Sequence, residues 1–594
     1  MKIFKYLIVM SLLLQVSCKK DLADQFRNPE NYSETGNLFG GMFSGMLYTY
    51  KLYIQDYGEF YWQFNSGTEI PGYAQLSQRY ITNRYTWFSD YDDMSGTNAF
   101  GGLTDNLWNN RMNDFYTRLR AWAVLKDQLA TVSGQQLTDN KIYYSLATIM
   151  KDFCAALNVD FYNSIPYSDA FKGAQSVFFP KYDDPLEIYK SILAELKTIG
   201  EELPATYAAM SDLGKGVFKQ QDFAFKGDIQ KWVRYTYALR LKYAIRISGV
   251  DDATAKAQLQ DIVSKNMLPQ TDLGWTMPID NAAIGGGTWA RGLYENYFAT
   301  FIPNIMMKRM NRDSALYQPG IDDPRLPVIA QPTYFFDSYD PARNGRRYIG
   351  VSYNADAQLA DYSAGQQYYR GALDPVAVLQ QNARSQYSMA TFTHNAKFPV
   401  YMSSLAESDL FLAEAALKNL VVTGKTPADH IKDAIAHSTT FWYAVNAVST
   451  MAASVGNGRF GADSAKYFYP APPAASVVAQ YSDSIKTRFN TRATLEDKME
   501  LLMQQKYIHL NIMAPFEIWA ELRRTRHPYL EPMTFNTKVM KPFPERLRYP
   551  RSELQTNLDN YLKVKDQDNF TTPVFWVPAA QRAILPYWPN YSYQ

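Results

Sequence analysis

Residues 495–525, LEDKMELLMQQKYIHLNIMAPFEIWAELRRT, predict a long helical block towards the C-terminal end of the chain. One end of this block carries an aromatic residue among four charged ones: Trp519, Glu517, Glu521, Arg523 and Arg524. We interpret these five side chains as structural, with the tryptophan anchoring the core and the charged neighbours pairing with one another. The block therefore favours a helical fold, and we do not expect it to contact a ligand.

Further helices are predicted upstream, in pairs separated by short turns. The stretch 184–187, DPLE, has an Asp cap, a proline at the first helical position and a carboxylate three residues after the cap. This helix is expected to stop before Pro204. A helix starts in the same way at Thr426-Pro427, and other helical stretches cover 104–129, 231–247 and 408–420. The fold class is therefore predicted as mainly α with tetratricopeptide-like helix pairs, although no strict period of about 34 residues is visible.

Long irregular segments separate these helical pairs: 66–105, 269–289, 318–374 and 457–488. They are rich in Gly, Pro, Tyr and Asp. Structureless loops of this length are usually functional or disordered. These contain too many aromatic residues for plain disorder, so we predict long irregular ligand-binding loops.

The composition excludes some function classes. The 594 residues include 60 Lys and Arg against 58 Asp and Glu, a net charge of +2 without a basic block, so nucleic-acid binding is not expected. Aromatic residues make up 15% of the chain, with 45 Tyr and 11 Trp. Many must lie in the core, but a protein that stacks sugars or other flat ligands also needs aromatic rings at its surface.

The chain opens MKIFKYLIVMSLLLQVSCKK, in which Cys18 closely follows an apolar run. A transmembrane helix needs about 20 apolar residues, so this run is too short. A basic start, an apolar core and a small residue before the cysteine are typical of a secretory signal, and the cysteine itself predicts lipid attachment at Cys18. The alternative is an ordinary signal peptide that happens to contain a cysteine. The predicted organisation is a lipoprotein signal peptide (1–17), a flexible tether (18–32) and a helical domain (33–594).

Motifs for catalysis or metal binding are weak. GNGRFG at 456–461 matches the GxGxxG pattern, but the residues after it do not predict the helix that a dinucleotide site requires. His430 and His437 could share a helix face, but two ligands do not make a metal site. No GxSxG elbow is present, whereas a distant carboxylate pair for glycoside cleavage stays open. These features favour binding over catalysis, and Cys154, in an apolar stretch, is expected to be a free buried thiol.

Three blocks carry a family resemblance: FPVYMSSLAESDLFLAEAALKNL (398–420), MQQKYIHLNIMAPFEIWAELRRTRHPYL (503–530) and RLRYPRSELQTNLDNY (546–561). Together they resemble the helix signatures of the SusD/RagB-like nutrient-binding outer-membrane lipoproteins. The segments 162–171, 180–193 and 222–248 are similar to one branch of that family. The resemblance runs from about residue 108 to residue 561, which is most of the chain.

The resemblance implies a SusD-like fold and a function in nutrient uptake without catalysis. Such a lipoprotein captures nutrients, most often oligosaccharides, and acts as the lid of a SusC-like TonB-dependent transporter in the outer membrane. Lys19-Lys20-Asp21 is weakly similar to the signals that send these lipoproteins to the cell exterior. No cofactor is implied beyond the lipid on Cys18. The family allows a bound calcium ion, but no acidic loop here has a recognisable ligand spacing.

Ligand contacts are predicted in the aromatic loops. A sugar ring offers an apolar face for stacking and hydroxyl groups for polar side chains, so Trp or Tyr next to Asn, Asp, Gln or Arg is the expected pattern. The predicted ligand-binding residues are Trp87, Asn98, Trp275, Trp289, Arg291, Tyr294 and Tyr334. For each of them alone, a structural role is the alternative.

Three functions are compatible with these sequence features. A surface nutrient-binding lipoprotein predicts glycan binding without turnover. A lipid-anchored glycan hydrolase predicts a close carboxylate pair in a cleft and shortened products. A helical-repeat scaffold that binds only protein predicts no affinity for small molecules.

Overall fold

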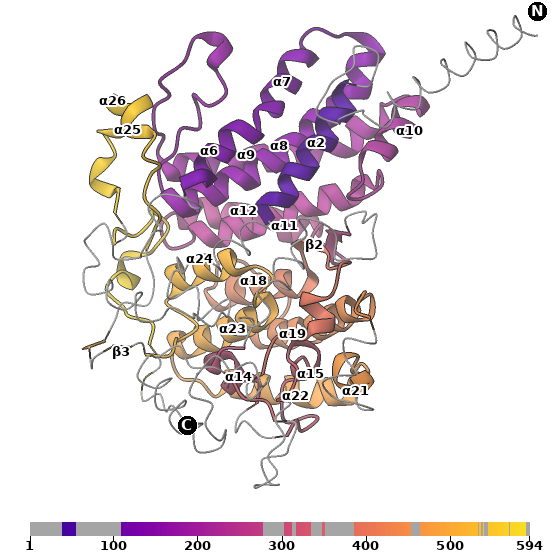
Figure 1. Cartoon of the computed structure of the whole chain (residues 1–594), viewed down its shortest axis with the longest axis vertical. Helices are drawn as coiled ribbons and strands as arrows, with labels where there is room; N and C mark the ends of the chain where they lie inside the picture. Colours follow the sequence, from indigo (N-terminus) through magenta and orange to yellow (C-terminus); the bar gives the residue numbers. More distant parts are fainter. Residues whose placement is uncertain are drawn as a thin grey trace, which may run out of the picture.

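The computed structural model shows a chain built mainly of α-helices, which confirms the predicted fold class (Figure 1). The structure describes residues 38–54, 109–276, 302–311, 316–333, 347–350, 385–452, 464–532, 534–535, 538–539, 545–569, 571–587 and 589. The helices of the first half are α2 (Leu38–Ile54), α6 (Asn109–Arg118), α7 (Arg120–Leu129), α8 (Gly134–Tyr162), α9 (Pro185–Ala208), α10 (Asp212–Gln221), α11 (Ile229–Ile247) and α12 (Asp252–Lys265). The main helices of the second half are α14 (Asn304–Met310), α15 (Leu326–Ile329), α18 (Leu405–Leu417), α19 (Pro427–Ala447), α21 (Ser464–Phe468), α22 (Ala475–Asn490), α23 (Leu495–Leu510), α24 (Pro515–Thr525), α25 (Glu553–Thr556) and α26 (Leu558–Tyr561).

The two halves of the chain form two packed groups of helices, except that α25 and α26 lie beside the first group, where Tyr182 donates a hydrogen bond to Glu553 (Figure 1). In the first group α9 packs against both α8 and α11, and α2 packs on α8. In the second group α19 packs against α18 and α22, and α23 packs against α18 and α24. Contacts between α11 and α18 join the groups. None of the helices in the described ranges has the length and apolar content required to cross a bilayer.

Two short antiparallel sheets accompany the helices. Strand β1 (Leu273–Trp275) pairs with β2 (Val400–Ser403), and β3 (Thr534–Phe535) pairs with β4 (Lys538–Val539). The β1–β2 pair joins the end of the first helical group to the start of the second. Strand β1 lies inside the segment 269–289, for which the sequence predicted only an irregular loop.

The predicted helix starts are confirmed. Asp184 Oδ1 accepts hydrogen bonds from the backbone N–H groups of Leu186 and Glu187, at 2.9 and 3.2 Å. Thr426 caps α19 by accepting a hydrogen bond from Asp429 N at 3.2 Å. Both caps satisfy N–H groups that have no partner within the helix.

The largest departures from the predicted helices are one extension and two divisions, and α18 begins and ends three residues earlier than the predicted stretch 408–420. Helix α9 was expected to stop before Pro204 but continues through it to Ala208. Burial of the adjacent Leu203 and packing of the helix offset the loss of the backbone hydrogen bond that proline cannot make. The block 495–525 is divided at Asn511, which has a positive φ of 30°. The stretch 104–129 is likewise divided into α6 and α7 at Leu119, within the part that the structure describes.

Helix α22 was missed because most of its residues, like all of α21, fall within the segment 457–488, predicted as a loop. Tyr481, Ile485 and Phe489 are spaced four residues apart, and all three are buried. This spacing places them on one face of a helix, which packs against α19. The helical period was therefore present in the sequence, but the prolines that precede it favoured a loop.

Helices α9 and α11 approach each other closely at Gly200. A Cβ atom there would overlap with Thr236 Oγ1 and lie 3.3 Å from Tyr237 Cε2. Thr236 Oγ1 donates a hydrogen bond to Val233 O at 2.7 Å, so the hydroxyl is held in place. The absence of a side chain at Gly200 is therefore required for this helix packing.

Replacing Gly200 with alanine is expected to lower the free energy of unfolding by about 1–3 kcal/mol, because the added methyl group forces the helices apart. The matched control is Gly216→Ala on the exposed face of α10, where nothing lies within 4 Å of the added Cβ. There alanine is expected to raise the free energy of unfolding by up to about 1 kcal/mol. Urea unfolding followed by circular dichroism measures both. Effects of the same sign and size would contradict the role of close approach.

Candidate ligand-binding site

Most of the predicted ligand-binding residues lie outside the described residues. These are Trp87, Asn98, Trp289, Arg291, Tyr294 and Tyr334, together with the predicted lipid-attachment residue Cys18. Trp275 is described, at the end of β1, immediately before the segment that contains Trp289. The described structure therefore shows how the base of this segment is held.

Trp275 lies in the core of the protein. Its side chain is only 4% exposed. The indole stacks on Tyr50, with ring centroids 6.3 Å apart and an interplanar angle of 18°, and it meets Phe223 edge-on at 6.3 Å. A ring enclosed in this way offers no open face to a ligand. We therefore assign Trp275 to the core, which corrects its predicted role as a stacking residue.

The strand that carries Trp275 is held against β2 by a close backbone approach. A Cβ atom at Gly274 would lie 2.6 Å from Val400 O, so only glycine fits at this position. The register pairs Trp275 with Val400 and Leu273 with Ser403. Helix α11 also packs against β2. The start of the predicted ligand loop is thus fixed to both helical groups.

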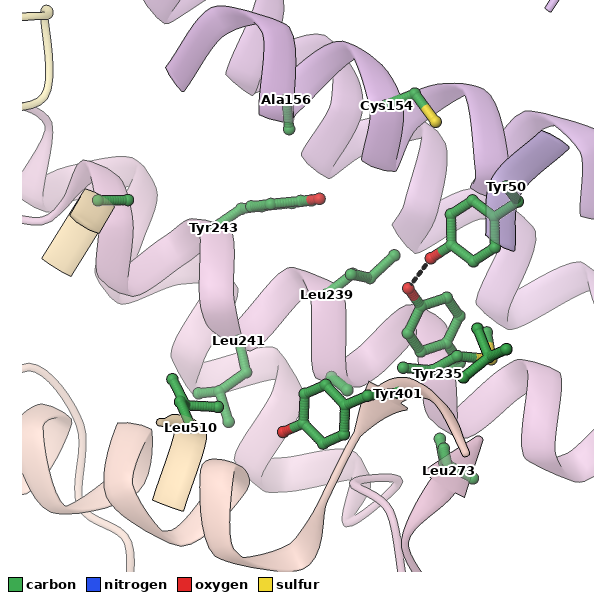
Figure 2. Close-up of a cluster of buried hydrophobic side chains, with 14 of the residues drawn as sticks. Tyr50, Cys154, Ala156, Tyr235, Leu239, Leu241, Tyr243, Leu273, Tyr401 and Leu510 are labelled. Atoms are coloured by element: carbon green, nitrogen blue, oxygen red, sulfur yellow. Dashed lines mark hydrogen bonds between the residues drawn. The ribbon is translucent and has the colours of Figure 1, made fainter. Parts of the chain in front are cut away.

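The core around this strand contains several tyrosines (Figure 2). Tyr50 and Tyr235 share a hydrogen bond between their hydroxyl groups, and both rings are buried. Burial raises the pKa of Tyr235, which keeps the phenol neutral. Cys154 lies in the same region, buried and outside any disulfide, as predicted.

The charged residues of the 495–525 block form ion pairs in the interior. Arg246 on α11 contacts Asp160 at 2.8 Å and Glu517 at 2.5 Å. The guanidinium of Arg523 lies 3.6 Å from the ring centroid of Trp519, which is fully buried. These contacts connect α8, α11 and α24, so the structural interpretation of the block is confirmed.

The network continues from α24 to α18. Arg524 donates to both oxygens of Glu414, at 2.6 and 2.7 Å, and to Glu521 Oε2 at 2.6 Å. Lys506 Nζ adds a contact of 3.0 Å to Glu521. The side chains of this network are nearly inaccessible to solvent, and they contact one another. They are Glu414, Lys506, Glu521 and Arg524. Buried carboxylates of this kind hold elements together and are closed to a substrate.

His430 and His437 do share a helix face, and both approach Asp409. The Nδ1–O distances are 3.9 Å for His430 and 2.6 Å for His437. The hydrogen bond to Asp409 raises the pKa of His437. Burial alone would raise the pKa of Asp409, but its interactions with both histidines lower it. Across the described ranges, no group of three or more His, Cys, Asp or Glu side chains is placed to hold a metal ion.

Comparison with known proteins identifies the family. A family model described as "Starch-binding associating with outer membrane" matches residues 64–550, which is more than half of the chain. The chain belongs to this SusD-like family. Its members are binding proteins, so the SusD-like protein described here is a non-catalytic protein associated with the outer membrane.

Solved structures share the SusD-like fold. A chitin-binding protein is 20% identical with a TM-score of 0.62, and the match covers 90% of this chain and 99% of the other. A chitin-binding SusD homolog from Flavobacterium johnsoniae is 19% identical with a TM-score of 0.60, covering 91% and 99% of the two chains. A SusD homolog from Bacteroides uniformis is 20% identical with a TM-score of 0.57, also covering 91% and 99%. No curated protein sequence matches the chain significantly.

Proposed function

We propose that this SusD-like protein captures oligosaccharides or other nutrients at the cell surface and delivers them to a SusC-like TonB-dependent transporter, on which it acts as a lid. The family match over residues 64–550, with its starch-binding description, is the observation that carries the proposal. The absence of a nucleophile or metal motif in the sequence supports capture rather than cleavage. The buried state of the described carboxylate network is consistent with the same role.

The proposed anchor is a lipid on Cys18 in the outer membrane, with the helical domain facing the cell exterior. Residues 18–32 are polar and charged and would serve as a flexible tether. A tether of this kind keeps the local concentration of the lid near its transporter high and allows the lid to open. The amino-terminal sequence supports both the proposed lipid anchor and the proposed tether.

The proposed ligand is a glycan bound by the aromatic loops, through Trp87, Asn98, Trp289, Arg291, Tyr294 and Tyr334. Support comes from the fixed base of the 277–301 segment at Trp275 and from the type of these side chains. Two of the structural neighbours are named as chitin-binding, and the family as starch-binding. Oligosaccharides of chitin and of starch are therefore the first ligands to test.

Calorimetric titration of the chain from Lys19 with chitohexaose and maltohexaose tests the proposal. We expect saturable binding to at least one of them, with the sugar recovered unchanged. Replacing Trp289 with alanine is expected to weaken this affinity by about tenfold or more, because a stacking face is lost. The control is Phe178→Ala, which removes a ring that is 69% exposed in the connection between α8 and α9. This variant is expected to bind the hexasaccharides with the affinity of the unaltered chain.

Other outcomes would separate the alternatives. Shortened sugars after incubation would contradict the non-catalytic proposal and favour a hydrolase. Failure to bind any glycan would contradict glycan capture and leave another nutrient, or a protein alone, as the partner. Equal affinity of Trp289→Ala and the unaltered chain would remove Trp289 from the proposed site.

A further inference from the structure

A buried histidine lies between two carboxylates at the turn that follows α24. The side chain of His527 is only 1% exposed. Its Nδ1 lies 2.9 Å from Glu500 Oε2, and its Nε2 lies 2.8 Å from Glu496 Oε2. Glu496 and Glu500 are four residues apart on α23, so both project from one face of this helix. An ionised carboxylate only accepts hydrogen bonds, so both ring nitrogens of His527 must carry a proton to make these two contacts.

The carboxylates stay ionised because they have further donors. Glu500 Oε1 accepts a hydrogen bond from Arg309 at 2.8 Å, and Glu500 Oε2 accepts one from Tyr529 N at 2.7 Å. Burial alone would raise the pKa of Glu500, but Arg309 and His527 outweigh it and lower the pKa to about 2. The hydrogen bond from His527 also lowers the pKa of Glu496. The geometry therefore describes an imidazolium between two carboxylates.

The surrounding charges favour the same protonation state. Within the described residues, the charged and titratable groups of this cluster are Arg309 from α14, Lys418 at the end of α18, Glu496, Asp497 and Glu500 from α23, and Arg526 and Tyr529 from the turn itself. Burial alone would lower the pKa of His527, but the hydrogen bonds to the two glutamates outweigh it and raise the pKa above its ordinary value of 6.5. The second proton is thus held more tightly in the folded protein than in water.

The same turn holds a segment near the carboxyl end of the chain, residues 579–587. The polar contacts, each written from donor to acceptor, are Arg526 Nε to Gln581 O at 2.7 Å, Leu530 N to Pro586 O at 2.7 Å and Gln581 Nε2 to Glu496 Oε1 at 3.4 Å. Two apolar side chains of this segment, Ile584 and Leu585, are 41% and 52% exposed. A segment with so little apolar burial is expected to open locally before the helices unfold.

We infer that the His527 imidazolium is a pH-sensitive clasp. While both ring nitrogens carry protons, it holds the turn 525–531, and with it the segment 579–587, against α23. Loss of one proton to solvent leaves a ring lone pair facing a carboxylate oxygen, so one of the two contacts becomes repulsive. The turn and the segment then open together. The clasp is independent of the proposed capture of nutrients.

The direction of the pH effect follows from the protonation of His527. In the open form the imidazole is exposed to water and has its ordinary pKa of 6.5, whereas the pKa of the closed form is higher. The clasp therefore contributes its full stability below pH 6.5 and loses it as the pH rises through the folded-state pKa. Between the two values the closed form holds one more proton, so the equilibrium constant for opening rises about tenfold per pH unit.

Histidine NMR tests whether the ring is an imidazolium. The chain from Lys19, labelled with ¹³C at histidine Cε1, contains five histidines, and single His→Gln variants assign their signals. If the variant at His527 does not fold, its signal is assigned by elimination. We expect the His527 signal to titrate with a midpoint above 6.5. A midpoint at or below 6.5 would overturn the inference.

Hydrogen–deuterium exchange of the same chain measures the opening. Peptides covering 526–532 and 579–587 are followed from about pH 5 to about pH 9, with correction for the intrinsic pH dependence of amide exchange, and α12 serves as the internal reference. Protection of both segments is expected to be constant below pH 6.5 and to fall about tenfold per pH unit above it, until it levels off. Protection of α12 should not change. Protection of the two segments that does not depend on pH, or that falls equally in α12, would contradict the clasp.

The variant Glu496→Gln tests the contact itself. The side chain of Glu496 is 49% exposed, and glutamine keeps an acceptor oxygen while removing the charge. We expect the His527 midpoint to move down towards 6.5 and the total fall in protection to become smaller. The matched control is Glu202→Gln, at a carboxylate that is 58% exposed and 3.5 Å from Lys141, and it should change neither quantity.

Circular dichroism spectra that match the unaltered chain establish that both glutamine variants are folded. An unchanged His527 midpoint and an unchanged pH profile in folded Glu496→Gln would show that the histidine is not held by two carboxylates, and the inference would fall. Equal shifts in Glu496→Gln and Glu202→Gln would also overturn it, since the effect would then come from net charge alone.

Discussion

Replacing Glu414 with glutamine is expected to lower the free energy of unfolding by about 3–5 kcal/mol, because the change leaves the buried Arg524 guanidinium without its bidentate partner. Glu414 is fully buried and receives two hydrogen bonds from Arg524, at 2.6 and 2.7 Å, and one from Lys418 at 2.6 Å. Glutamine keeps the size of the side chain and removes its charge. Urea unfolding at neutral pH measures the loss.

The matched control is Asp483→Asn, which breaks an exposed ion pair of similar length. Asp483 lies 2.5 Å from Lys432, with 54% and 36% of the two side chains exposed. Solvent screening limits the contribution of such a pair to at most about 1 kcal/mol. A Glu414→Gln loss as small as the control would contradict the structural role of the buried network.

The pH dependence gives a second measurement of the same interaction. Burial alone would raise the pKa of Glu414, but Arg524 and Lys418 outweigh it and lower the pKa to about 2. Because the folded-state pKa lies below the ordinary value of 4.5, the carboxylate contributes its full stability above about pH 4.5. That contribution is lost as the pH falls towards 2. The difference between the unaltered chain and Glu414→Gln is therefore expected to narrow over this interval.

The parts of the fold that were predictable depend on neighbouring residues. The caps at Asp184 and Thr426 bind N–H groups two or three residues away, so they are visible in a short stretch of sequence. Strand β1 is different, because its three residues become a strand only by pairing with Val400–Ser403, more than a hundred residues later. The continuation of α9 past Pro204 likewise depends on tertiary packing.

The candidate sites depend even more on contacts between distant segments. The residues next to Trp275 in the sequence resemble those of a ligand-binding loop. Only the positions of Tyr50 and Phe223 in the structure reveal that the indole is enclosed. A pocket lined by Trp122 on α7, Lys151 on α8 and Glu195 on α9 was not predicted for the same reason, since Trp122 fits the apolar face of a helix and Glu195 resembles any surface carboxylate. A tryptophan, a lysine and a glutamate on three helices show no common pattern until the helices pack.

Replacing Trp275 with alanine is expected to lower the free energy of unfolding by about 3–5 kcal/mol, because it leaves a cavity between Tyr50 and Phe223. The milder Trp275→Phe variant retains an aromatic ring and is expected to lose less stability. Its affinity for hexasaccharide should equal that of the unaltered chain, since no face of the indole is open to a ligand. Urea unfolding and calorimetric titration of the same preparations measure the two quantities.

The comparison with Trp289→Ala separates core from site, because that variant is expected to lose affinity and to keep its stability. The two tryptophans lie on one stretch of chain, but only Trp275 is placed in β1 against β2. If Trp275→Phe kept the stability of the unaltered chain and lost hexasaccharide affinity, the indole would have to contact the ligand in a conformation that exposes it. Loss of stability with unchanged affinity would instead establish that Trp275 serves the core and does not contact the ligand.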